Sequence, residues 1–326
     1  MRQRQRHRNK KKETLLQNVI NWSFTLLLAC GLGIQVFGAS DNNLKFAQVS
    51  DAHFSTTEAD TSYKVLSQSP QILDDVILQI NDIPDINFTI FTGDLVNKPK
   101  ESQLVEFISH ANCLKAPWYA TDGNHDVQQF KMSKENFFKI ICCHNPNFSY
   151  SGPYYAFTPK DGYRVICLDS IVLNRATTNG EVDEEQVKWL KTELDKAKND
   201  VVVICLHVPI VEPYHSESHR LLNRMELMEL FHKYHNPIIV CSGHFHGSKL
   251  VQDNNILYVD SPSLVTYPCA FRIININNQR NKVIVDVYTK QTRLKSALDS
   301  AKNKVFGASY LTGKPEDQNN TFEIKK

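Results

Sequence analysis

The stretch LKFAQVSDAH, residues 44–53, joins an apolar run of strand character to two polar side chains, Asp51 and His53. Four further apolar runs end in the same way, each in a short polar motif. These motifs are Gly93-Asp94, Gly123-Asn124-His125-Asp126, His207 and Gly243-His244-Phe245-His246. Because ligands bind beyond the carboxyl ends of strands in open α/β sheets, we expect the five loops to meet at one place.

Strand-like runs alternate with helical periodicity along most of the chain. Strands are expected near residues 44–50, 87–91, 118–121, 163–168, 201–206, 238–241, 256–259, 271–276 and 282–288, and helices near 71–80, 184–197 and 221–234. Turn residues at Lys160-Asp161-Gly162 and at 277–281 indicate hairpins. This alternation predicts an α/β fold with mixed sheets and helices outside them.

The first 40 residues differ in composition from the rest. Residues 2–12 carry seven of the 37 Lys and Arg, so the remaining chain has 30 basic against 35 acidic residues. An apolar stretch at about 19–39 follows, which predicts an export signal cleaved near Gly38-Ala39-Ser40 or an uncleaved membrane anchor. Both place the folded body outside the cytoplasm, as a secreted, periplasmic or membrane-anchored protein. A lipoprotein-like cysteine at Cys30 and a buried helix are the remaining alternatives.

The composition allows one large core, because 41% of the 326 residues are hydrophobic. We expect three segments: residues 1–40 as the basic region and the signal or anchor, 41–290 as one catalytic domain, and 291–326 as a polar C-terminal tail with room for one short helix. Membrane contact is expected only through residues 19–39. No basic surface interleaved with aromatic residues indicates nucleic-acid binding.

The eight cysteines do not form the pattern of a disulfide framework. Cys167, Cys205 and Cys241 lie inside apolar runs, where a cysteine usually acts as a small hydrophobic residue. Cys142 and Cys143 are adjacent and so cannot readily pair with each other. We expect the first three to be core thiols, and the pattern weakly contradicts export.

The polar motifs offer enough ligands for two metal ions. Imidazole with carboxylate suits Zn, Fe, Mn or Ni, and the motifs contain no cysteine, which excludes a thiolate-rich structural zinc site. Asp94 is the natural bridge, because a carboxylate readily binds two cations, whereas Asn124 contributes a neutral carbonyl oxygen. Glycine precedes Asp94, Asn124 and His244, and we expect it to allow sharp backbone turns there.

The order D-x-H, G-D, G-N-H-D, H, G-H-x-H resembles the calcineurin-like metallophosphoesterase superfamily over residues 44–288. The resemblance implies two mixed β-sheets packed as a sandwich and flanked by α-helices. It assigns one metal ion to Asp51, His53, Asp94 and His246, and a second to Asp94, Asn124, His207 and His244. It also implies that His125 is a catalytic group, paired with the acid Asp126, and not a ligand.

Two ions about 3.5–4 Å apart can hold a bridging hydroxide that attacks phosphorus in line. The expected activity is therefore hydrolysis of a phosphodiester or phosphomonoester with Mn, Fe or Zn. His125, protonated with help from Asp126, is expected to stabilise or protonate the leaving oxygen. Two alternatives remain: a metal-binding protein without turnover on the same fold, and ordinary polar residues at strand ends.

Other segments resemble the branch of class III cyclic-nucleotide phosphodiesterases and related small phosphatases, among them Tyr154-Tyr155-Ala156-Phe157 and Ser261-Pro262-Ser263. Asn97 departs from purple acid phosphatases, which carry an iron-binding tyrosine there. We expect specificity to depend on the loops 54–69, 127–153 and 210–220. In the last of these, His215 and His219 either help to bind phosphate or are solvated.

Overall fold

The apolar runs form two mixed β-sheets of six strands each, with the orders β12-β11-β10-β1-β2-β3 and β4-β5-β6-β7-β9-β8. This computed structural model describes residues 42–149, 152–305 and 309–326. The parallel strands are β1 (Asn43–Val49), β2 (Phe88–Thr92) and β3 (Trp118–Thr121) in the first sheet, and β5 (Tyr163–Cys167), β6 (Val201–Cys205), β7 (Ile238–Ser242) and β9 (Ile256–Asp260) in the second. The expected mixed sheets are confirmed.

Antiparallel strands complete each sheet. They are β4 (Tyr155–Phe157), β8 (Lys249–Asp253), β10 (Ala270–Asn278), β11 (Lys282–Gln291) and β12 (Asn320–Lys325). The β4–β5 and β10–β11 pairs are the two hairpins that the turn residues indicated. Between the sheets, Gln48 Nε2 on β1 donates to the Ser242 carbonyl on β7 at 2.9 Å, which ties the centres of the two layers together.

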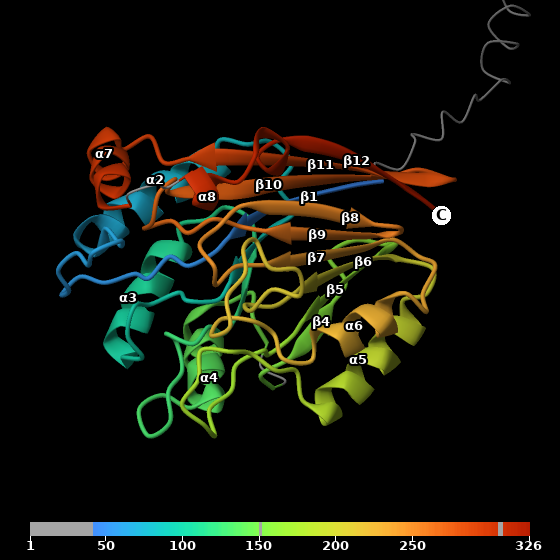
Figure 1. Ribbon diagram of the computed structural model, residues 1–326, viewed down its shortest axis with the longest axis horizontal. Coiled ribbons are helices and arrows are strands. Elements are labelled where there is room, and N and C mark those ends of the chain that lie inside the picture. Colours follow the sequence, from blue (N-terminus) through green and yellow to red (C-terminus); the bar gives the residue numbers. More distant parts are fainter. Residues whose placement is uncertain (1–41, 150–151, 306–308) are drawn as a thin grey trace, which may run out of the picture. The chain divides into compact units, whose positions relative to one another are not determined.

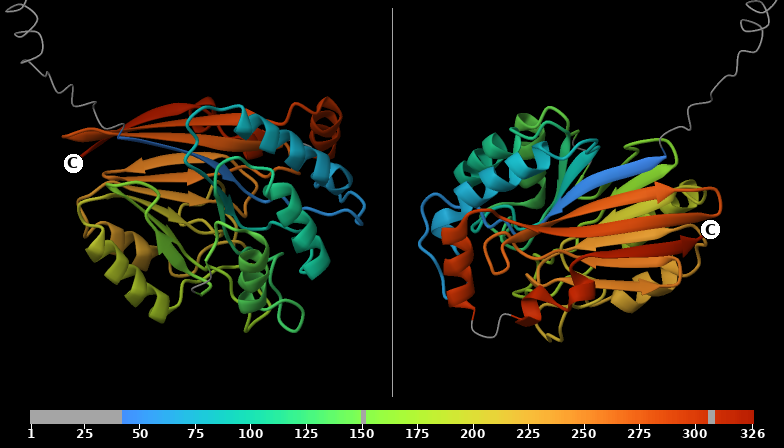
Figure 2. Two further views of the ribbon diagram at one scale, coloured as in Figure 1. Left: turned by 180° about the vertical axis from the view of Figure 1, so that it is seen from behind. Right: turned by 90° about the horizontal axis from the view of Figure 1, so that it is seen from above.

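The helices lie outside the sheets, α2, α3 and α4 on one flank and α5 and α6 on another (Figures 1 and 2). Their bounds are α2 (Ser69–Asn81), α3 (Glu101–Ala111), α4 (Lys134–His144), α5 (Glu184–Lys196) and α6 (Arg224–Phe231), with a short 3-10 turn η1 (Leu66–Gln68) before α2. Side-chain caps begin two of them: Ser133 accepts from Asn136 N–H at the start of α4, and Asp183 accepts from Gln186 N–H at the start of α5.

The core lies between the sheets and beneath the helices. Every residue of β2, β6, β7 and β9 is buried, as their nearly all-apolar sequences predict. Cys167, Cys205 and Cys241 are fully buried in these layers. Their expected role as core thiols is confirmed.

The segment after Gln291 is more than the expected polar tail. It contains the expected short helix, α7 (Lys295–Lys304), and then α8 (Ser309–Thr312), η2 (Pro315–Asp317) and the edge strand β12, which pairs antiparallel with β11. Residues 321–324 alternate polar and apolar, and Ile324 is buried. The Asp317 carboxylate accepts from Leu250 N–H at 3.0 Å and so fixes this segment to β8.

The predicted basic region and signal or anchor at residues 1–40 lie outside the described residues and stay a prediction. In the described part of the chain, no helix combines the length and the apolar character needed to span a bilayer.

Candidate metal centre

The five polar motifs meet where the parallel strands of both sheets end. Asp51 follows β1, Asp94 follows β2 and Asn124 follows β3, all from the first sheet. The second sheet supplies His207 after β6 and the His244-Phe245-His246 loop after β7. The expected convergence of five loops is therefore what the fold produces.

The backbone at the site is held in the left-handed region, which is rare for residues other than glycine. Nine described non-glycine residues have positive φ, and five of them are predicted metal ligands. These are Asp51 (51°), His53 (39°), Asp94 (52°), His244 (68°) and His246 (57°). Each such residue costs on the order of 1–3 kcal/mol and persists only where surrounding contacts impose it, most often at functional sites.

The three glycines of the motifs allow close approach more than sharp turns. Only Gly93 has a positive φ, 82°. A Cβ on Gly243 would lie 1.8 Å from Ser50 Oγ, and a Cβ on Gly123 would lie 2.2 Å from Asp94 Oδ1. The expectation of sharp turns thus holds at Gly93. At Gly123 and Gly243 the backbone must instead pass directly against a neighbouring motif.

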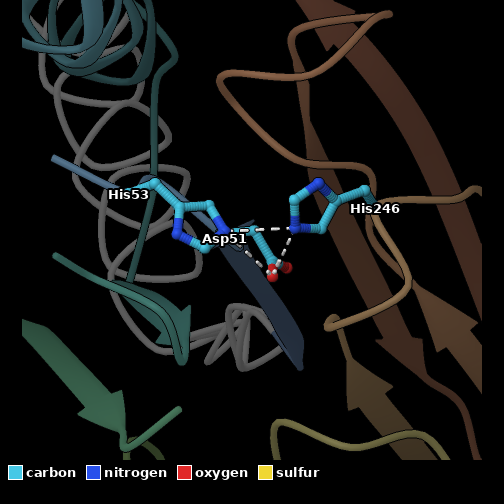
Figure 3. Close-up of side chains that lie close together, drawn as sticks. All are labelled: Asp51, His53 and His246. Carbon is cyan, nitrogen blue, oxygen red and sulfur yellow. Dashed lines mark hydrogen bonds and ion pairs between the residues drawn. The ribbon is translucent and has the colours of Figure 1, made fainter. Parts of the chain in front are cut away.

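The first cluster comprises Asp51, His53 and His246 (Figure 3). The two imidazoles face each other with 3.1 Å between their Nε2 atoms, and His246 Nε2 lies 3.3 Å from Asp51 Oδ1. Asp94 approaches from β2, with 3.5 Å between its Oδ2 and His53 Nε2. All four side chains are buried.

The second cluster is centred on His207. Its Nε2 lies 3.4 Å from Asp94 Oδ2, 3.2 Å from Asn124 Oδ1 and 3.2 Å from His244 Nδ1. The same oxygen, Asp94 Oδ2, therefore belongs to both clusters. The position of this oxygen is compatible with the predicted bridging role of Asp94, which stays a prediction.

The donor atoms fit metal ions. A tetrahedral site with Zn–N bonds of about 2.0–2.1 Å places its ligand atoms about 3.4 Å apart. Six of the separations between donor atoms are 3.1–3.5 Å, and the 3.9 Å between Asp51 Oδ1 and His53 Nε2 is longer. Asp51 Oδ1 is also buried without a hydrogen-bond partner, although buried carboxylate oxygens are normally paired. A cation between these atoms would satisfy that oxygen and separate the opposed imidazole nitrogens.

Protonation states suit cation binding at His53 and His244, whereas a cation at His207 would have to displace a ring proton. Burial lowers the pKa of His53 and of His244 well below the usual range, so both rings are neutral and offer a lone pair. Burial opposes ionisation of Asp94, yet His207 and its neighbouring imidazoles hold the pKa of that carboxyl well below its usual range. Burial likewise opposes protonation of His207, but the Asp94 carboxylate raises the pKa of the ring to about 10.

In three of the four histidine ligands the ring nitrogen that faces away from the clusters has a partner of its own, whereas His244 Nε2 is buried without one among the described residues. His207 Nδ1 donates to the Thr92 carbonyl at 2.8 Å, and His246 Nδ1 lies 2.8 Å from Thr266 Oγ1. Such contacts fix the tautomer and the orientation of a metal ligand. His53 Nδ1 instead faces Lys64 Nζ at 3.2 Å, and burial lowers the pKa of this lysine to about 8. Lys64 could not be recognised from the sequence, because its contact with His53 depends on how the loop between β1 and η1 folds.

His125 lies beside the two clusters. Its ring Nδ1 donates to the Asn97 carbonyl at 2.7 Å, and its backbone N–H donates to Asp94 Oδ1 at 2.8 Å. The ring packs edge-on against His53, with 4.6 Å between centroids. This arrangement leaves Nε2 as the atom available to a bound substrate.

Asp126 does not pair with His125 as the sequence predicted. It is buried, and its two oxygens accept hydrogen bonds from Val96 N–H and Gly123 N–H, both at 2.9 Å. The carboxylate therefore joins the loop after β3 to the loop after β2, and the Asn97 carbonyl orients His125 in its place. Burial first, and Asp94 next, raise the pKa of Asp126 to about 8.

We expect Asp126→Asn to destabilise the fold, because an amide group can accept only one of these two hydrogen bonds and presents a donor to the other N–H. The expected loss is about 1–3 kcal/mol in the free energy of unfolding, measured by urea denaturation above pH 8, where Asp126 is ionised and both of its oxygens accept. Asp299→Asn, on the exposed face of α7, is the matched control. Unchanged stability with lower turnover would instead support a pairing of Asp126 with His125.

The histidines of the 210–220 loop separate into two groups. His219 packs toward the site, with 5.2 Å between its ring centroid and that of His244. His215 is 73% exposed and lies 3.0 Å from Glu217. Of the two candidates for phosphate binding, only His219 reaches the rim of the site. Tyr63 also reaches the rim of the site, with 6.0 Å between its ring centroid and that of His246. No sequence motif had pointed to this residue.

A cavity of about 630 Å³ opens beside Asn124 and His125. It is lined by the loops after β2 and β3 and by residues 171–173 and 175–178, which follow β5. The first residues of the expected specificity loop 127–153 supply part of this wall, whereas its middle forms α4.

The model of the family "Calcineurin-like phosphoesterase" matches residues 44–248, and the chain belongs to this family of phosphoric ester hydrolases. A "Probable cyclic nucleotide phosphodiesterase" of Colwellia psychrerythraea is 28% identical over 71% of this chain and 82% of its own length. A "Probable glycerophosphodiester phosphodiesterase GpdQ" of Arcobacter nitrofigilis is 26% identical over 66% and 77%. Human tartrate-resistant acid phosphatase type 5 is 26% identical over 72% and 76%.

Among solved structures, a dimetal phosphatase from Danio rerio superposes with a TM-score of 0.61 at 14% identity, covering 76% of this chain and 99% of its own. The likeness confirms the expected fold of two mixed sheets flanked by helices.

Proposed function

We propose that the chain hydrolyses phosphodiesters at two metal ions held by the seven residues of the strand-end motifs. Asp51, His53, Asp94 and His246 would hold one ion, and Asp94, Asn124, His207 and His244 the other. The observation that carries this proposal is Asp94 Oδ2, which lies within 3.5 Å of a ring nitrogen in each cluster. When bound, the ions would activate water and polarise the phosphoryl group.

The protein's own contribution is to orient the metal ligands and to exclude water from the site. The left-handed backbone directs the ligands of both sheets toward one point, and their burial leaves little solvent to compete for the ions. Thr92 and Thr266 fix the rings of His207 and His246 from behind. Such preorganisation lowers the reorganisation needed during reaction.

His125 is proposed as the catalytic group that acts on the leaving oxygen. Its hydrogen bond to the Asn97 carbonyl requires a proton on Nδ1, so protonation adds the second proton at Nε2. Nε2–H then donates to the leaving oxygen, which takes the proton as the P–O bond breaks. Asp126 supports this arrangement only indirectly, by joining the loops on which His125 and Asn97 lie.

A diester is favoured over a monoester by the cavity beside His125. Its volume of about 630 Å³ provides room for an esterifying group on the leaving side of the phosphorus. Two of the relatives named above are phosphodiesterases, which supports the same preference, although a third is a phosphatase.

The test compares bis-p-nitrophenyl phosphate with p-nitrophenyl phosphate on protein stripped of metal and then supplied with Mn, Fe or Zn. We expect no turnover by stripped protein, recovery with at least one metal, and a larger kcat/KM for the diester. Recovery with a preference for the monoester would overturn the diester assignment. Absence of hydrolysis with every metal would support a protein that binds metal without turnover.

A further inference from the structure

The cavity beside His125 is lined by cations without a matching carboxylate. Lys98, Lys131 and Arg175 belong to its wall, and none of the described residues that line it is Asp or Glu. The other polar lining groups include the amides of Gln128 and Gln129, which can also donate hydrogen bonds. The wall therefore suits an anion.

Two of the three cations have carboxylate partners outside the cavity. Lys98 Nζ lies 2.8 Å from Glu58 Oε1, and Arg175 pairs with Glu181 at 2.5 Å. Among the residues that the structure describes, Lys131 Nζ has no ion pair or hydrogen bond with a side chain. Because the Arg175 pair is half exposed, it contributes little stability and can exchange for another anion.

If His125 acts on the leaving oxygen as proposed, the cavity lies on the leaving-group side of the centre. Asn124 and His125 are among its lining residues, so a leaving oxygen that contacts His125 Nε2 places the rest of its alcohol near these cations. Phe130, 97% exposed, adds an apolar surface to the same wall. The positive charge of the cavity wall and its position beside His125 together indicate that an alcohol with an anionic group fits.

We propose that the preferred substrate is a phosphodiester whose leaving group carries a second anionic group, bound by Lys131 and Arg175. This inference rests on the proposed function, since it takes His125 as the group on the leaving side. In the reaction, the bond between phosphorus and the leaving oxygen breaks and a bond from phosphorus to a water oxygen forms. His125 gives its proton to the leaving oxygen, the attacking water releases a proton to solvent, and His125 takes one up again from solvent. The second anion is unchanged and serves only for recognition.

The experiment uses two esters that differ by one charge, methyl 4-nitrophenyl phosphate and methyl 3-carboxy-4-nitrophenyl phosphate. After correction for their uncatalysed rates, we expect the wild-type protein to prefer the carboxylated ester in kcat/KM. The preference should decline toward 1 M NaCl, where the screening length is about 3 Å. A third ester with a 3-phosphonomethyl group distinguishes a carboxylate from a phosphate-like anion.

The variant Lys131→Ala/Arg175→Ala should lower this preference about tenfold and leave kcat/KM for methyl 4-nitrophenyl phosphate, which lacks the second anionic group, nearly unchanged. Lys233→Met, at an exposed lysine in the turn after α6, is the control and should keep the preference. If the wild-type protein hydrolyses both esters without preference, or the double variant keeps it, the inference is wrong and the proposed function stands. If neither ester is hydrolysed with any metal, the proposed function fails as well.

Discussion

Asp94→Ala is expected to lose both metal ions and to reduce diester hydrolysis roughly 10³-fold or more. Asp94 Oδ2 lies 3.5 Å from His53 Nε2 and 3.4 Å from His207 Nε2, so one side chain contributes to both clusters. Its removal also takes away the negative charge that favours a cation among four imidazoles. Asp94 Oδ1 further holds the backbone N–H of His125, which would lose its position.

Metal content after dialysis, measured by elemental analysis, is the direct readout for this variant. Asp299→Ala, an exposed carboxylate on α7, is the matched control and should keep both ions. Thermal unfolding of metal-free protein shows whether the variant is folded. Full metal loading of the folded Asp94→Ala protein would contradict the assignment of Asp94 as the shared ligand.

His125→Ala is expected to keep both ions and to lower kcat by about 10²–10⁴-fold, the usual contribution of a general acid. The loss should be larger for esters with poor leaving groups, because these need the proton most. The reason is structural: His125 Nδ1 is held by the Asn97 carbonyl at 2.7 Å, and Nε2 remains for the leaving oxygen.

The competing role for His125 is that of a ligand, since one of its ring nitrogens lies within 4.8 Å of donor atoms of both His53 and Asp94. Metal analysis of the variant separates the two roles. His232→Ala removes a histidine that pairs with Asp253 on the surface, and it should change neither the metal content nor kcat. Loss of one ion from His125→Ala would show that the ring binds metal.

Most strands could be predicted because the sheet interiors are buried on both faces and so appear as continuous apolar runs. All nine expected strands exist, with ends displaced by at most a few residues. Strands β8 and β12 were missed and β4 was indicated only through its hairpin turn, since these strands are short or lie at an edge and have fewer apolar residues. Edge strands depend on pairing that local sequence does not encode.

The helices were predicted less completely. The expected helices at 71–80, 184–197 and 221–234 correspond to α2, α5 and α6. Helix α3 was missed although Leu104, Phe107, Ile108 and Ala111 are spaced to face the core. Helix α4 lies inside the segment expected to be a specificity loop, and its buried residues Phe137, Phe138 and Ile141 carry the missing signal.

At the site, the residues that the motifs marked come together because strand ends determine where they lie. The contacts between motifs could not be predicted in the same way. Asp126 bonds to two backbone N–H groups and Lys64 approaches His53 from a loop, and both depend on the folded path of the chain. The left-handed backbone of the ligands has the same origin, because tertiary contacts impose it.

The central claim is that one carboxylate, Asp94, joins two metal sites. Diffraction from crystals of the Mn-loaded protein, measured where manganese scatters anomalously, tests it most directly. We predict two anomalous peaks about 3.5–4 Å apart, with Asp94 between them and His53 and His207 on opposite sides. A single peak, or a second peak out of reach of Asp94, would contradict the account.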